Sequence, residues 1–355
     1  MISNNRYLSP QKWDLKIKSL KFRLFTTIVG YSVLNQPIYA YNLGKGPKKI
    51  LIWSQMHGNE STTTRALLDL FEYLHTKDGF RLLKGLTLMI IPQLNPDGAL
   101  NYTRFNANNV DLNRDAMNLT QPETIALINV FNAFLPDFCF NLHEQRSIFS
   151  AGKMGRPATI SFLSPASDVQ RNLTPARITA MQLIGHVNKE LQKLIPNQIG
   201  RYDDTFNPNC IGDHFISLGV PTLLFEAGHN NLDYDRNFTK TMIFNALLIA
   251  LNAIENDDFL NYTTSAYDEI PENQKDYVDI IVKNIDIRTD SGFFKNQELG
   301  LLYKEEKKNE SVLFRPFCHC FSKKIDLLAH KILDAKENLK ANEIKFIIGK
   351  TINIF

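Results

Sequence analysis

The sequence lacks a long hydrophobic run, a basic tract and a secretory leader. Its first residues, MISNNRYLSPQKWDL, do not show the basic-then-apolar pattern of a signal peptide. No segment reaches the roughly 18 uninterrupted apolar residues of a transmembrane helix. The net charge is only +3, which argues against a nucleic-acid or membrane partner. We therefore predict a cytoplasmic protein, and the initiating Met1 argues against a removed leader.

Cysteine is also scarce in this chain. Cys139, Cys210, Cys318 and Cys320 are unevenly spaced, which is not the pattern of a disulfide framework. Cys318 and Cys320 flank a histidine, but no second ligand pair with suitable spacing follows, so we predict no metal site there. With 355 residues, 44% of them hydrophobic, the chain can bury a core that needs neither disulfides nor a structural metal.

Short apolar runs, each followed by polar residues, alternate with helical patterns. Runs of this kind are typical of strands buried on both faces of a sheet, and their alternation with helices indicates an α/β fold. We predict strands at 50–53, 86–91, 138–142 and 220–225, and helices at 61–75, 121–134 and 175–194. The expected architecture is a mixed, mostly parallel sheet flanked by helices. Ligands bind such sheets beyond the carboxyl ends of the strands, where the polar residues lie.

The character of the chain changes after residue 260. Residues 261–274 are polar and rich in turn formers, which predicts a linker. Beyond them, residues 277–282 and 344–348 have the composition of strands. We predict a catalytic domain at 1–260 and a small β-rich domain at 270–355.

The residues from His57 to Glu60 form the most specific local motif, an H-x-x-E pair directly after a predicted strand. Two ligands three residues apart can chelate one ion when the chain turns between them, and Gly58 permits a turn. Imidazole and carboxylate suit zinc, and a catalytic zinc site needs three protein ligands. His143, which also follows an apolar strand, is the best third ligand. By itself an H-x-x-E pair also arises by chance.

Three further features lie at predicted strand ends. Asn95-Pro96-Asp97-Gly98 is a turn signature. The segment 104–114 carries two arginines, and a guanidinium can bind a carboxylate bidentately, although a solvated loop is the simpler interpretation. Glu226 ends an apolar strand, where a carboxylate is costly unless it is paired or functional.

Together these motifs resemble those of the M14 zinc carboxypeptidases, the family related to carboxypeptidase A. The resemblance spans roughly residues 40–250 and depends on HGNE, NPDG, RFNANNVDLNRD, the strand leading to His143, and FEAG, in the family's order. It implies the zinc carboxypeptidase fold and one zinc ion held by His57, Glu60 and His143. It also implies an amide hydrolase that acts beside a free carboxylate.

The resemblance assigns a role to several other residues. Glu226 would act as the catalytic base, and Arg104 would stabilise the oxyanion of the tetrahedral intermediate. Asn113 and Arg114 would bind the terminal carboxylate of the substrate.

Two family features are ambiguous in this sequence. The tyrosine that contacts substrate corresponds to Tyr202 by distance from Glu226, although Phe206 competes for the place. The floor of the side-chain pocket falls near residues 210–213, where Ile211 would favour apolar terminal side chains and Asp213 basic ones.

Three functions are compatible with these observations. The first is a metallocarboxypeptidase that acts on peptides. The second is a zinc-dependent deacylase of the aspartoacylase and succinylglutamate desuccinylase type, which the C-terminal β-domain favours and the NPDG and 104–114 segments disfavour. The third is a non-catalytic binding module, which the complete set of site residues opposes. Nothing in the sequence predicts an oligomeric state.

Overall fold

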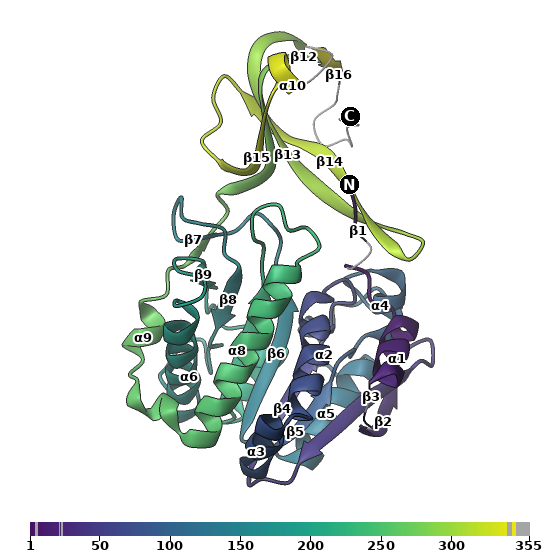
Figure 1. The fold of residues 1–355 in the computed structure, drawn as a ribbon, viewed down its shortest axis with the longest axis vertical. Coiled ribbons are helices and arrows are strands. Elements are labelled where there is room, and N and C mark those ends of the chain that lie inside the picture. Colours follow the sequence, from purple (N-terminus) through teal and green to yellow (C-terminus); the bar gives the residue numbers. More distant parts are fainter. Residues whose placement is uncertain (4–5, 21, 23, 339–342, 346–355) are drawn as a thin grey trace.

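The computed structural model describes residues 1–355 except 4–5, 21, 23, 339–342 and 346–355. Its larger part contains an eight-stranded mixed sheet, and a second, β-rich sheet stands above it (Figure 1). In spatial order the strands of the larger sheet are β2 (Phe25–Tyr31), β3 (Pro37–Gly44), β5 (Leu86–Ile91), β4 (Lys48–Ser54), β6 (Phe138–Glu144), β10 (Thr222–Ala227), β8 (Ile160–Leu163) and β9 (Ile199–Arg201).

All four predicted strands are confirmed in the centre of this sheet. β5, β4, β6 and β10 run parallel to one another. β3 pairs antiparallel with β5 and β2 antiparallel with β3, while at the other edge β8 pairs antiparallel with β10 and β9 parallel with β8. Parallel neighbours end at the same edge of the sheet. The register places Glu226 of β10 directly beside His143 of β6.

Helices cover both faces of the sheet. A large hydrophobic core lies under α1 (Pro10–Ser19), α2 (Thr62–Leu74), α3 (Lys77–Gly85), α6 (Pro175–Leu191) and α8 (Asn237–Asn256). A smaller core lies under α5 (Pro122–Phe134) and α7 (Ile211–Ser217) on the other face. The three predicted helices are α2, α5 and α6, and the predicted mixed α/β fold with a β-rich C-terminal sheet is confirmed.

Helix α8 is long and apolar enough to cross a membrane by length and composition alone. Half of its most apolar window is buried inside the protein, and its buried side includes Met242, Ile243, Leu247 and Leu251 of the large core. This packing is that of a core helix, which is hydrophobic because its neighbours cover it. The cytoplasmic location stays a prediction.

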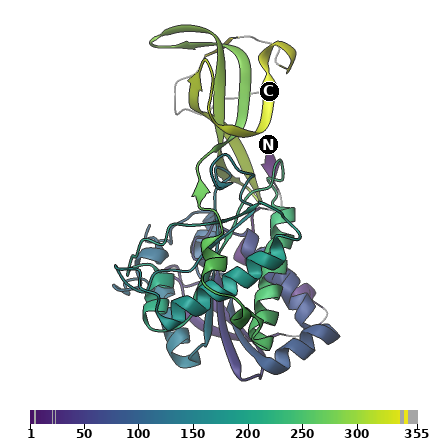
Figure 2. The ribbon, with the colours of Figure 1, turned by 90° about the vertical axis from the view of Figure 1, so that its left-hand side faces the viewer.

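The second sheet consists mostly of C-terminal strands, which lie side by side at the top of Figure 2. Its strands are β1 (Ile2–Ser3), β14 (Ser311–Ser322), β13 (Gly292–Lys308), β12 (Tyr277–Thr289), β15 (Leu328–Asp334) and β16 (Glu343–Lys345), and α10 (Ala335–Asn338) follows β15. Residues 346–348 of the last predicted strand lie outside the described residues. Because β1 pairs with β14, the first residues of the chain join this sheet. The division at 1–260 and 270–355 stays a prediction.

The predicted linker contains regular structure. It includes the end of η2 (Asp258–Asn261), α9 (Ser265–Asp268) and β11 (Asn273–Gln274), which pairs with β7 (Ser150–Ala151). Polar and turn-forming residues therefore marked short elements packed on the larger domain here.

One local prediction near the site was wrong in detail, and the turn predicted at Gly58 is confirmed but was only part of the reason for a glycine there. The NPDG segment is not a simple turn but starts α4 (Pro96–Asn101), in which the side chain of Asn95 accepts a hydrogen bond from the backbone N–H of Gly98. Gly58 is needed for close packing: a Cβ there would lie 1.9 Å from the carbonyl carbon of Gly98. The backbone of α4 thus fixes the position of the HGNE loop.

Candidate active site

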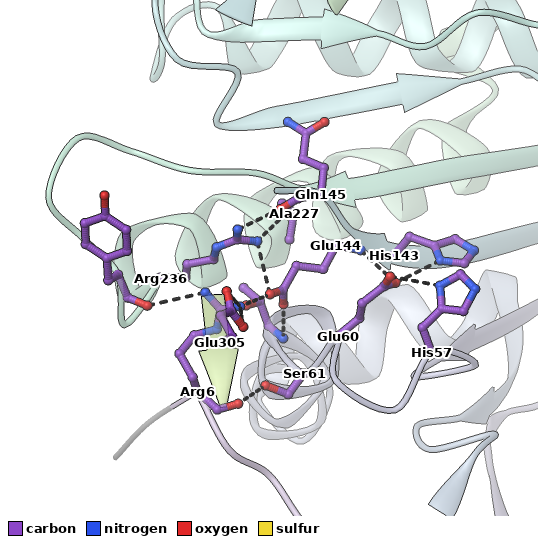
Figure 3. Close-up of polar contacts among 12 residues, drawn as sticks. Arg6, His57, Glu60, Ser61, His143, Glu144, Gln145, Ala227, Arg236 and Glu305 are labelled. Atoms are coloured by element: carbon purple, nitrogen blue, oxygen red, sulfur yellow. Dashed lines mark hydrogen bonds and ion pairs between the residues drawn. The ribbon is translucent and has the colours of Figure 1, made fainter. Parts of the chain in front are cut away.

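His57, Glu60 and His143 form one buried cluster at the carboxyl ends of β4 and β6 (Figure 3). Glu60 Oε1 lies 2.8 Å from His57 Nδ1, and Glu60 Oε2 lies 3.0 Å from His143 Nδ1. One ligand atom from each residue falls within 4.8 Å of the others. Two imidazole nitrogens and a carboxylate are donors that suit zinc, and three protein ligands leave a position open for chemistry. Among the described residues, no other His, Cys, Asp or Glu group meets this criterion.

Asp111 contacts His57 at the ring nitrogen that does not face Glu60. Its Oδ1 lies 3.0 Å from His57 Nε2, and its Oδ2 accepts hydrogen bonds from the Arg104 guanidinium. A proton on Nε2, bonded to this carboxylate, leaves Nδ1 free to bind a metal. Asp111 is a site residue to which we assigned no role from the sequence, although it lies inside the 104–114 segment.

Burial and the neighbouring carboxylates have opposite effects on the pKa of His57. Burial disfavours the charged imidazolium, but the neighbouring Glu60 and Asp111 carboxylates outweigh it and raise the pKa of His57. A metal ion must displace the proton from Nδ1, so its binding to this cluster depends on pH.

Glu226 ends β10 beside the cluster. It lines the same cavity as His57, Glu60 and His143, which has a volume of about 270 Å³. Its Oε2 is buried and has no hydrogen-bond partner among the described residues. Burial, followed by the charge of Glu60, raises the pKa of Glu226 well above its ordinary value. A carboxylate without a fixed partner is free to take a proton from a reacting group.

Arg104, Asn113 and Arg114 line the metal-site cavity from the 104–114 segment. Arg104 Nη1 lies 3.4 Å from Glu60 Oε1, which places a guanidinium at the edge of the cluster. Asn113 Oδ1 accepts a hydrogen bond from the backbone N–H of Ile211. Arg114 Nη1 donates to the carbonyl of Asn113 and contacts Cys210 Sγ at 3.0 Å. The two predicted carboxylate-binding residues therefore lie side by side.

The side chains of Asn113 and Arg114 also line a neighbouring cavity of about 420 Å³. Tyr202 and Phe206 both line it, but only Tyr202 also lines the metal-site cavity with Glu226. Burial and the nearby carboxylate of Glu226 raise the pKa of the Tyr202 phenol, so it stays protonated. Of the two alternatives, Tyr202 lies closer to the metal cluster.

The same cavity bears on whether Ile211 or Asp213 faces the side chain of the terminal residue. Asp213 lines it, whereas Ile211 is fully buried and packs in the smaller core. The carboxylate of Asp213 accepts a hydrogen bond from the backbone N–H of Asn207, and burial raises its pKa to about 6. At pH 7 the cavity thus offers a largely ionised carboxylate and no isoleucine side chain.

Glu144, next to His143, belongs to a buried ion network (Figure 3). Its backbone N–H donates to Glu60 Oε2, and its side chain pairs with Arg6 and Arg236. Arg6 also contacts Glu305 of β13 at 3.2 Å. The network therefore connects the metal cluster with the N-terminal segment and the C-terminal sheet.

Comparisons with known proteins give the same assignment. Residues 16–143 match the family model described as zinc carboxypeptidase, Peptidase M14. Carboxypeptidase 2 of Trichophyton rubrum is 32% identical over 114 residues, which cover 31% of this chain and 20% of that protein. Over this segment the chain is similar to the M14 zinc carboxypeptidases. It spans only about a fifth of the length of the fungal relatives that it matches.

Solved carboxypeptidase structures share the fold of this chain. A metallo-carboxypeptidase of Pseudomonas aeruginosa, solved with (2-guanidinoethylmercapto)succinic acid, superposes with a TM-score of 0.54 at 17% identity, covering 71% of this chain and 70% of that one. Bovine thrombin-activatable fibrinolysis inhibitor, solved with tick carboxypeptidase inhibitor, gives 0.57 at 14% identity, covering 72% and 99%. At these identities the likeness concerns the fold.

Proposed function

We propose that this chain is a zinc-dependent metallocarboxypeptidase that hydrolyses the amide bond next to a free C-terminal carboxylate of a peptide. The observation that carries the proposal is the buried cluster of His57, Glu60 and His143 in one cavity with Glu226. The match of residues 16–143 to the zinc carboxypeptidase family model supports the same activity.

The residues divide the chemistry among them. Zinc held by His57, Glu60 and His143 would polarise the scissile carbonyl and make water a better nucleophile. Glu226 takes a proton from the attacking water and returns it to the departing amine. Arg104 donates to the oxygen on which negative charge develops.

Substrate orientation comes from the adjoining cavity. Arg114 and Asn113 bind the terminal carboxylate there, because a guanidinium forms charge-assisted hydrogen bonds with a carboxylate. Tyr202 covers the junction between this cavity and the metal site. The carboxylate of Asp213 in the same cavity favours lysine or arginine as the terminal residue.

The alternative is a deacylase that acts on N-acyl amino acids. A small acyl amino acid needs little room on the acyl side of its amide. Besides the cavity at Arg114, however, the metal site adjoins a third cavity of about 640 Å³, enough for a peptide segment. This space favours the peptidase.

The test is hydrolysis by the zinc-loaded protein of three matched substrate sets. These are peptides with a free C-terminus, the same peptides as C-terminal amides, and N-acyl amino acids. We expect release of the terminal residue from the free peptides, fastest for lysine or arginine, and none from the amides. Cleavage of the acyl amino acids alone would reject the peptidase.

A further inference from the structure

The cavity of about 640 Å³ lies between the larger domain and the C-terminal sheet. Arg146 and Gln145, which follow β6, line it from the larger domain. Tyr303 and Lys304 of β13 and Phe317 of β14 line it from the other side. The second sheet thus builds one wall of a cavity whose opposite wall includes Glu60 of the metal cluster.

This cavity and the one at Arg114 lie on different sides of the metal site. They share no lining residue. Each nevertheless shares several residues with the metal-site cavity: Glu60, Arg104 and Arg146 on one side, and Arg114, Tyr202 and Glu226 on the other. With the terminal residue at Arg114, a substrate places its acyl part in the cavity beside the second sheet.

We call the cavity of about 640 Å³ the acyl-side cavity. Most of the charged side chains that line it are already paired. Arg6 and Arg236 are buried against Glu144, and Arg6 also pairs with Glu305. Arg104 is bound to Asp111 and Glu60. The carboxylates of Glu144 and Glu305 thus offset the charges of Arg6 and Arg236 and leave these two arginines little capacity for a ligand. Arg104 already has its proposed role at the oxyanion.

Arg146 and Lys304 are different. Both are exposed, and in the part of the chain that the structure describes the guanidinium of Arg146 has no hydrogen-bond or ion-pair partner. Lys304 has only an exposed pair with Glu306 at 3.5 Å, whose carboxylate is held more closely by Arg315 at 2.6 Å. Exposed pairs of this kind contribute little. The cavity therefore carries one guanidinium without an ion-pair partner among the described residues and one lysine whose ion pair is weak.

We propose that this cavity is the subsite for the acyl part of the substrate, and that Arg146 and Lys304 select a residue with a side-chain carboxylate just before the scissile bond. A guanidinium that lines both the metal site and the cavity can bind such a carboxylate by charge-assisted hydrogen bonds. The inference rests on the proposed peptidase and assigns the C-terminal sheet a role in specificity.

The hairpin of β13 and β14 is anchored firmly enough to serve as this wall. Glu305 accepts a hydrogen bond from Tyr102, and Lys307 Nζ donates to the carbonyl of Leu100 at 2.6 Å. Asp279 of β12 accepts hydrogen bonds from Tyr234 at 2.7 Å and from the backbone N–H of Tyr303 at 2.6 Å. Lys304 is thus held between two fixed neighbours.

The experiment compares two peptides that differ only in glutamate or glutamine at the penultimate position. Zinc-loaded enzyme is assayed for kcat/KM, and the E226Q variant for binding without turnover. We expect a preference for glutamate of roughly tenfold in both, which is the scale of one charge-assisted hydrogen bond. R146Q and K304Q should each lower this ratio, and the double variant should bring it near one. K308Q, four residues further along the same strand, should keep it.

The two readouts separate this inference from the proposed function. Terminal-residue release with equal rates for the two peptides would overturn the inference and leave the peptidase standing. If no peptide is cleaved, the peptidase fails, and binding to E226Q still decides whether the cavity selects a carboxylate. Equal binding of the two peptides to E226Q, or an unchanged glutamate-to-glutamine ratio in the double variant, would overturn the inference.

Discussion

Glu60 is buried and Glu226 is partly buried, and these neighbouring carboxylates have different surroundings. Glu60 lies within 3.0 Å of the Nδ1 atoms of two histidines and accepts a hydrogen bond from a backbone N–H, whereas Glu226 Oε2 has no partner among the described residues. Fixed partners suit a metal ligand, and their absence suits a proton carrier. The surroundings therefore give the two carboxylates separate tasks.

Replacing Glu226 by glutamine should separate metal binding from turnover. The amide keeps the shape of the side chain but cannot accept the proton, so we expect full zinc content and a kcat lower by about two to four orders of magnitude. Steady-state kinetics and metal analysis of the purified variant check both. Full activity with full zinc would mean that another group is the base.

Asp111 positions His57 and should be needed for tight metal binding. In D111N the Nε2 proton of His57 loses its carboxylate partner, so we expect zinc affinity to fall by about 10- to 100-fold with the fold retained. Competition with a chelator measures this affinity. D290N, which removes an exposed carboxylate of the β12–β13 turn, is the control. Equal zinc affinity in D111N and wild type would contradict the positioning role.

The sequence predicted which residues gather at the site because each lies beside a short motif at a strand end. It did not predict the role of Asp111, since an acid in a loop of amides looks like a solvated residue until His57 is placed against it. Gly58 lies in the predicted turn, but its close approach to the backbone of α4 was not predicted. Both depend on contacts between segments about 40 to 55 residues apart.

At the scale of elements, the β13–β14 hairpin is tied to the larger domain by charged residues. Arg6 lies between Glu144 and Glu305, and it is fully buried. Removing one member of a buried network leaves uncompensated charge, so R6M should lower the free energy of unfolding by about 3 kcal/mol. Denaturant unfolding measures this change.

Lys12 offers a matched control for Arg6. It pairs with Glu310 of the same hairpin, but both side chains are partly exposed, so K12A should cost less than about 1 kcal/mol. Equal losses in the two variants would show that the buried network is no stronger than a surface pair.

His229 and His330 meet where the second sheet contacts the larger domain, with ring centroids 4.4 Å apart. Burial, followed by the charges of neighbouring groups, holds the pKa of His229 well below its ordinary value, and burial also lowers that of His330. The unfolded chain binds these protons more tightly, so stability is lost as pH falls below about 6.5.

Thermal unfolding between pH 8 and pH 5 tests this contact. Between pH 8 and pH 5 the melting temperature of H330Q should fall less than that of wild type, because one buried imidazole no longer titrates. H319Q removes an exposed histidine and should behave as wild type. An identical pH profile for H330Q and wild type would exclude the histidine pair as the cause.

Element prediction succeeded where the signal is local. Apolar runs and helix patterns identified the four central strands and the helices α2, α5 and α6. The pairing of β1 with β14 could not be predicted, because two residues at one end of the chain carry no pattern that names a partner about 310 positions away.

At the scale of the whole molecule, the second sheet is part of the active-site region. The sequence predicted a separate small β-domain, because residues 261–274 have the composition of a linker. Charged residues such as Arg6, Arg236 and Glu305 carry no pattern that names their partners. In the structure Arg6 pairs with Glu305 and Glu144, and Arg236 pairs with Glu144, beside the cavity between the two sheets. The proposed specificity for the acyl part of the substrate therefore depends on a cavity built from several distant segments, which no single sequence motif contains.

The central claim is one zinc ion held by His57, Glu60 and His143, and the measurement that tests it most directly is the zinc content of the purified protein. We expect one zinc per chain in wild type and in C318S/C320S, and loss of zinc in H57Q and H143Q with the fold retained. Full zinc in both histidine variants, or its loss only in the cysteine variant, would contradict this account.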